Sequence, residues 1–255
     1  MKSRRLLAII LSIISGLSLF SGCENGCGIG WRLYESEYYI YTVGYDSGNV
    51  LIFGLTDKGR EQEYLVIPET IEGRKVVELR HTDYETKQII KKYGDAKYSG
   101  IQSDKLKKVF IIPQIKIWNM DFFQGAKNLY GVFYLSNNAS EYNGVNHYNY
   151  YYTKDNEVPK FAWDGCVANV TYYYNYENAP NDGYYWIDDY NYGEMIEYIP
   201  ENPTRESYQF AGWCKEPECV NAWSFEIDTL PQAQYVEQEK EIYQETKLYA
   251  KWIKN

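Results

Sequence analysis

Histidine is the side chain most often used for acid–base catalysis, and this chain offers it in only two places. His81 lies in an irregular stretch and His147 lies in a polar stretch rich in asparagine. A nucleophilic triad needs a histidine held within reach of its nucleophile. Neither position favours that arrangement, so we expect no catalytic residue and no enzymatic activity.

Carboxylates are numerous, but their spacing does not suit a two-carboxylate mechanism. The candidates are Asp188-Asp189, Glu194 with Glu197, and the run Glu237, Glu239 and Glu241. A glycosidase places two carboxyl groups at a set separation across a cleft. If the first pair lies in a strand, its two side chains point to opposite faces and cannot meet one ligand. We expect these carboxylates to form a solvated surface.

The sequence also shows no pattern typical of a cofactor site or a metal site. No glycine-rich loop follows a predicted strand, and no cluster of Cys and His has zinc spacing. We therefore expect no metal and no cofactor. The formal net charge is −9, and an acidic surface disfavours nucleic acid as a partner.

The N-terminus has the pattern of a secretory signal. Basic residues in 1–5 precede an apolar run over 6–20, which is shorter than the roughly 20 apolar residues of a membrane-spanning helix. Phe20-Ser21-Gly22-Cys23 resembles the lipobox of bacterial lipoproteins, although that family prefers Leu where Phe20 stands. The resemblance implies cleavage after residues 1–22, lipidation of Cys23 and a lipidated tether over 23–35. The alternative is an ordinary secretory signal with a free Cys23.

Two further cysteines, Cys214 and Cys219, lie close together on either side of Pro217. A location outside the cell permits disulfides, and a turn containing proline could bring the two sulfur atoms within bonding distance. The sequence leaves open whether they form a disulfide or two free thiols.

Strand-like runs dominate the first half of the mature chain. Residues 38–53 predict a hairpin around Asp46-Ser47-Gly48. Further on, Leu106, Val109 and Ile111 recur as Leu129, Val132 and Tyr134 at an offset of 23 residues, and Ile67-Pro68 recurs as Ile112-Pro113. Together these patterns resemble the BspA-like leucine-rich repeat.

We assign residues 36–137 to this repeat region, with an insertion near 80–104 that departs from the repeat. Within the insertion, residues 86–93 predict a short helix with Ile89, Ile90 and Tyr93 facing the core. Residues 138–164 form a connector rich in Tyr and Asn.

Tyrosine is unusually abundant, with 29 residues in the chain. Most of these tyrosines suit strands, because their rings tolerate either face of a sheet. Exposed aromatic rings are also favoured at binding surfaces. The candidates for ligand binding are Tyr172, Tyr174, Tyr184 and Trp186.

The C-terminal residues 165–255 carry a second set of strand patterns. Residues 167–176, 184–187 and 195–198 predict early strands. Four later pieces resemble the Listeria–Bacteroides repeat, also called the internalin B-repeat: Pro203-Thr204-Arg205, Tyr208–Trp213, Trp223-Ser224-Phe225 and Leu248–Trp252. The resemblance implies a small β-grasp-like module and implies no reaction. We expect the Trp213 ring to pack against Trp252 or Phe225.

The expected fold is therefore mainly β, with a short leucine-rich-repeat-like array followed by a β-grasp-like module. Together, the lipobox resemblance and the two repeat resemblances imply a non-catalytic lipoprotein at the outer face of a bacterial membrane, held there through Cys23. Its function would be adhesion, or the binding of a protein or glycan ligand. The alternatives are a carbohydrate-capture accessory protein that uses exposed Tyr and Trp, and an envelope hydrolase. The sequence does not indicate an oligomeric state.

Overall fold

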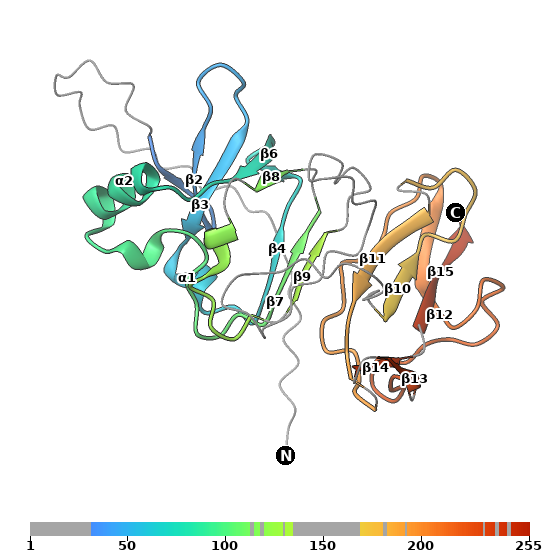
Figure 1. Cartoon of the computed structure of the whole chain (residues 1–255). Helices are drawn as coiled ribbons and strands as arrows, with labels where there is room; N and C mark the ends of the chain where they lie inside the picture. The colour runs from blue at the N-terminus through green and yellow to red at the C-terminus, as the bar shows by residue number, and fades with distance from the viewer. Residues whose placement is uncertain are drawn as a thin grey trace. The chain divides into compact units, whose positions relative to one another are not determined.

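The computed structural model describes most of the chain beyond the predicted signal and tether (Figure 1). The described residues are 32–112, 115–117, 120–129, 131–134, 169–180, 183–191, 193–231, 233–237, 240–243 and 246–255. Cys23 and the connector 138–164 lie outside them. Contacts join Trp31–Asn255 into one compact unit that is mainly β. Among the described residues, no helix is both long enough and apolar enough to span a membrane.

The first sheet contains the predicted hairpin. Its strand order is β1-β2-β3-β6-β5, and β8 pairs with β6. Strands β2 and β3 are antiparallel, and Gly48 takes the left-handed backbone conformation (φ +66°) that the Asp-Ser-Gly turn predicts. The strands of this sheet are β1 (Tyr34–Glu35), β2 (Tyr39–Val43), β3 (Val50–Leu55), β5 (Thr70–Ile71), β6 (Arg74–Leu79) and β8 (Lys116–Ile117).

The second sheet stacks three parallel strands in the order β4-β7-β9. These are β4 (Tyr64–Ile67), β7 (Lys108–Ile111) and β9 (Gly131–Tyr134). Val109 pairs with Val132, so the 23-residue offset read from the sequence is the register of β7 with β9. The two Ile-Pro pairs are 45 residues apart in the sequence, whereas the register of β4 with β7 is 44 residues, because Ile67 pairs with Ile111.

Both faces of this second sheet are buried. One face carries Leu65, Val109 and Val132 into the core of the repeat region. The other face carries Phe110 and Phe133, which pack with residues of the C-terminal region. Period-two alternation therefore gives two apolar faces here and no solvent face.

The insertion forms helix α2 (Asp83–Tyr93) and the 3₁₀ helix η1 (Ala96–Tyr98). Thr82 caps the start of α2 and accepts a hydrogen bond from the Tyr84 backbone N–H. Ile89 is buried as predicted, whereas Ile90 is exposed, since it lies about 100° around the helix from Ile89. The remaining short helices are α1 (Asp57–Arg60) and η2 (Met120–Phe123).

The C-terminal region is built on a four-stranded sheet of order β11-β10-β15-β12. Its strands are β10 (Val170–Tyr173), β11 (Tyr184–Asp188), β12 (Tyr208–Cys214) and β15 (Thr246–Lys254), and β13 (Ala233–Glu237) pairs separately with β14 (Lys240–Tyr243). The strand predicted over 195–198 is wrong. Ile196 is buried and its neighbours Met195 and Glu197 are exposed, so burial alternates here, but none of the described strands pairs with this segment.

Gly212 marks an irregularity in β12. The register of β12 with β15 shifts between Phe210 and Trp213, and Gly212 has φ +115°. That conformation favours glycine. Beyond the shift, the buried Trp213 ring packs against the rings of Tyr172, Tyr185 and Phe210.

Candidate functional site

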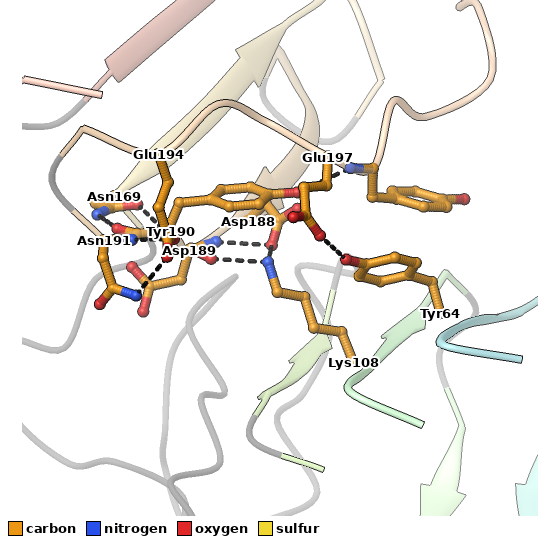
Figure 2. A network of polar contacts seen from close by, with 10 residues as sticks. Tyr64, Lys108, Asn169, Asp188, Asp189, Tyr190, Asn191, Glu194 and Glu197 are labelled. Carbon is orange, nitrogen blue, oxygen red and sulfur yellow. Dashed lines mark hydrogen bonds and ion pairs between the residues drawn. The ribbon is translucent and has the colours of Figure 1, made fainter. Parts of the chain in front are cut away.

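A buried ion pair joins the repeat region to the C-terminal region (Figure 2). Lys108 is the first residue of β7 and Asp188 is the last residue of β11. Lys108 Nζ lies 2.7 Å from Asp188 Oδ1, and both side chains are 0% exposed. Charged groups are seldom buried unless they are paired, because each loses its hydration. This pair is therefore the most unusual chemistry in the described chain.

Lys108 makes further contacts with the segment that follows β11. Its ammonium donates to the Asp189 carbonyl oxygen at 2.7 Å. Nζ also lies 3.5 Å from the centroid of the Tyr190 ring, a cation–π contact. On the neighbouring strand β9, Gly131 pairs with Lys108. A Cβ at Gly131 would come within 2.5 Å of the Phe133 ring, so glycine lets that ring cover this part of the sheet.

The two oxygens of the Asp188 carboxyl differ in their hydrogen bonds. Oδ1 accepts from Lys108 and from the Asp189 backbone N–H, at 2.7 Å in each case. Oδ2 makes no hydrogen bond of normal geometry with any described residue, although the Tyr190 hydroxyl is close enough to lower the pKa of the carboxyl. Burial outweighs these effects and raises the pKa of Asp188 above its ordinary value, while the Lys108 ammonium partly offsets that rise.

Aromatic rings surround the pair. The Phe110 ring centroid lies 4.7 Å from Trp186, 4.9 Å from Tyr198 and 5.2 Å from Phe133. These rings come from both regions and belong to one buried cluster. At its rim, the Tyr64 hydroxyl donates to Glu197 Oε2 at 2.6 Å. The shell gives the ion pair a low-dielectric environment.

Hydrogen bonds fix the irregular segment that carries Asp189 and Tyr190. Asn169 Nδ2 donates to the Tyr190 carbonyl at 2.6 Å, and its Oδ1 accepts from the Tyr190 N–H at 3.1 Å. The Tyr190 hydroxyl accepts from the Tyr198 N–H at 3.0 Å. Glu194 accepts from both the backbone and the side chain of Asn191. The carboxyl of Asp188 is thus held by neighbours that are themselves fixed (Figure 2).

The expectation that the acidic residues form a solvated surface is wrong for Asp188. Glu194 and Glu197 are exposed, as expected. Asp188 is buried because the strand alternation that separates it from Asp189 turns it inward, onto the face that meets Lys108. Lys108 was not a candidate from the sequence. The signal was available, since Val109, Phe110 and Ile111 are all apolar and indicate a strand buried on both faces.

The predicted ligand-binding aromatics divide into two pairs. Tyr172 and Trp186 are buried and face each other across β10 and β11, so they are core residues and offer no surface to a ligand. They share their face with Val170 and Leu248, which explains their burial. Tyr174 and Tyr184 are partly exposed.

A second aromatic group, which we call the Arg205 cluster, was not predicted. It consists of Arg205, Tyr176, Tyr208 and Trp252, all partly exposed. The guanidinium carbon of Arg205 lies 3.7 Å from the Tyr208 ring centroid and 4.4 Å from that of Tyr176. Trp252 Nε1 donates to the Tyr174 carbonyl at 2.6 Å. The Pro-Thr-Arg piece of the sequence thus supplies a cation held between two rings.

Cys214 and Cys219 are free thiols in the structure. Burial, followed by the neighbouring Cys219 thiol, raises the pKa of Cys214 to about 12. Cys219 is partly exposed and has a left-handed backbone (φ +53°) in the turn after β12. The two side chains lie near each other, as their spacing suggested, without a bond between the sulfurs.

A cavity of about 270 Å³ lies beside His81 and is lined by Ser99, Gln102, Phe122, Gln124 and Gly125. The Nδ1 atom of His81 is buried and makes no hydrogen bond to the described residues. Within the described part of the chain, no group of His, Cys, Asp and Glu side chains could hold a metal ion. His147 lies outside the described residues.

These features define a mainly β protein whose C-terminal sheet shares its core with the parallel sheet of β4, β7 and β9. Residues 169–251 match the family model of the Listeria-Bacteroides repeat domain. The match covers β10, β11, β12 and the β13-β14 hairpin, so the resemblance predicted for the C-terminal module is confirmed. No curated protein and no solved structure matches the chain.

Proposed function

We propose that this protein is a non-catalytic lipoprotein at the outer face of a bacterial membrane, where it binds a protein or a glycan. The observation that carries the proposal is the match of residues 169–251 to the Listeria-Bacteroides repeat domain. The N-terminal sequence adds the means of attachment, through lipidation of Cys23. Lipoprotein modification supplies more than one acyl chain, which stable anchoring needs.

The same proposal gives the described chain two functional parts. The parallel strands β4, β7 and β9, two of them related by 23 residues, support a short BspA-like leucine-rich repeat region. The sheet of β10, β11, β12 and β15 supports a β-grasp-like module. We infer that each of these two parts presents a surface for binding.

A pull-down tests the binding proposal. The full chain, solubilised in detergent and immobilised, is incubated with purified cell-wall glycans and, separately, with purified extracellular matrix proteins. We expect saturable capture of one of these classes. Absence of saturable binding to either class at micromolar concentration, with the protein shown to be folded by circular dichroism, would reject binding as its function.

The Arg205 cluster favours carbohydrate capture as the second candidate. Its rings are partly exposed, and aromatic rings offer flat apolar area with a polar edge. Replacing Tyr208 with Ala removes the ring nearest to the Arg205 guanidinium. If glycan is the ligand and this cluster is the site, Tyr208→Ala should weaken glycan binding at least tenfold. The matched control is Tyr45→Ala, since Tyr45 is 90% exposed in the β2-β3 turn. Equal binding by both variants would exclude the cluster.

A further inference from the structure

We propose that Lys108 and Asp188 become joined by an intramolecular amide bond between Lys108 Nζ and Asp188 Cγ. Nζ lies 2.7 Å from Oδ1, both side chains are fully buried, and the two residues are 80 positions apart in the chain. An amine held this close to a carboxyl group, with water excluded, has the proximity that amide formation needs.

The surroundings of the pair suit this reaction. The Asp189 N–H donates to Oδ1 at 2.7 Å, so it would stabilise negative charge on that oxygen when the amine adds to the carbon. The Asp189 carbonyl accepts from Nζ at 2.7 Å and fixes the direction of the amine. Both contacts come from backbone atoms beside Asp188, so they are in place before any reaction.

The dry aromatic shell also favours the reactive protonation states. An ammonium with a carboxylate carries two charges, whereas an amine with a carboxylic acid carries none. Transfer of one proton from Nζ to the carboxyl gives the uncharged pair, which a low-dielectric site favours. Burial raises the pKa of Asp188, and a raised pKa likewise favours the uncharged carboxylic acid.

The atoms balance without a further reagent. The Nζ lone pair attacks Cγ and forms the C–N bond, and the bond from Cγ to Oδ2 breaks. Oδ2 leaves as water with the acid proton and a second proton from nitrogen. Oδ2 is the carboxyl oxygen that makes no normal hydrogen bond to the described residues, so its departure breaks no such contact. The product is a neutral amide whose remaining N–H can still donate to the Asp189 carbonyl.

Such a bond would tie the repeat region covalently to the C-terminal module. A cross-link limits the conformations of the unfolded chain, and the effect grows with the length of the closed loop. The two regions could then not separate when the protein is pulled or partly unfolded. This property does not depend on which ligand the protein binds.

Peptide mass spectrometry tests the proposal on the full chain as purified. By sequence, trypsin cannot cleave after an amide-linked Lys108, so residues 108–116 would stay attached to residues 161–205. We expect one branched fragment whose mass is the sum of the two peptides less one water. Recovery of 161–205 as a separate peptide at its own mass, with no branched fragment, overturns the proposal.

Two variants serve as controls. Lys108→Arg keeps a positive charge and should yield only separate peptides. Asp188→Ala must lack the branched fragment whether or not the variant folds. If the branched fragment persists in Asp188→Ala, another carboxyl group is the partner, and the assignment to Asp188 is wrong.

Discussion

The Trp213 ring packs edge-on against the Tyr172 ring, with centroids 4.9 Å apart and an interplanar angle of 79°. The two residues lie on β12 and β10, which are not neighbours, because β15 runs between them. Trp213 pairs with Ala250 and Tyr172 pairs with Leu248 on that middle strand. The small Ala250 side chain leaves room for the indole to reach across. The Trp213 ring also packs on Phe210 and Tyr185, and the expected partners Trp252 and Phe225 are partly buried side chains packed against the same cluster.

Trp213→Ala should therefore destabilise the protein by about 3–5 kcal/mol, as expected for loss of a large aromatic side chain from a packed core. Chemical denaturation followed by circular dichroism measures this free energy of unfolding. Tyr45→Ala, at an exposed turn position, is the control and should change it by less than about 0.5 kcal/mol. A Trp213→Ala variant as stable as the control would show that the indole is not part of the core.

The double variant Lys108→Met with Asp188→Leu separates a covalent bond from an ion pair. The variant removes both buried charges and keeps apolar volume, which alone is often neutral or stabilising. It also prevents formation of the proposed amide. A cross-link that closes a loop of about 80 residues stabilises the folded state by roughly 4.5 kcal/mol. We expect the double variant to be less stable than the wild type by nearly that amount in denaturant titrations. A double variant at least as stable as the wild type would indicate an ion pair alone.

Gly212→Ala should be destabilising in spite of open space around the residue. No atom lies within 4 Å of a Cβ at this position, so no steric clash with neighbours opposes the change. The cost arises from φ +115°, which residues with a side chain rarely adopt, and we expect about 1–3 kcal/mol. Thermal unfolding of Gly212→Ala can be compared with that of Gln209→Ala, an exposed position in the same strand. Equal melting temperatures would mean that the bend tolerates a side chain.

Cys214 should react slowly with iodoacetamide in the folded, reduced protein. Its pKa is raised to about 12, chiefly by burial, so almost no thiolate is present at pH 8. Since trypsin cleaves after Lys215, the two cysteines of the turn fall in separate peptides and their labelling can be followed individually. We expect Cys219 to be labelled first, and both to be labelled alike in denaturant. Equal labelling rates in the folded state would contradict the buried position of Cys214.

Cys23→Ala should move the protein from the membrane fraction to the soluble fraction. The expected reason is loss of the acyl chains that the lipobox resemblance implies. Labelling of cells with a fatty-acid analogue measures the modification itself. If label is still incorporated after the substitution, the lipobox is not at Cys23.

The sequence by itself determined the local elements and their spacing. The Asp46-Ser47-Gly48 turn rests on the conformational preferences of three adjacent residues, and the helix within the insertion rests on the spacing of its apolar residues. The register of Val109 with Val132 equals the 23-residue offset at which the apolar pattern recurs in the sequence. The four C-terminal pieces identified the module because their order and spacing are properties of the chain alone.

Only the tertiary structure decided which faces are covered. Alternation places Tyr172 and Tyr173 on opposite sides of β10, but it cannot say which side meets a core made by strands far along the chain. Asp188 and Lys108 are an example of the same limit, since no pattern in the sequence pairs these two residues. Their burial is possible only because folding brings together two side chains 80 residues apart, and each makes the other's loss of water tolerable.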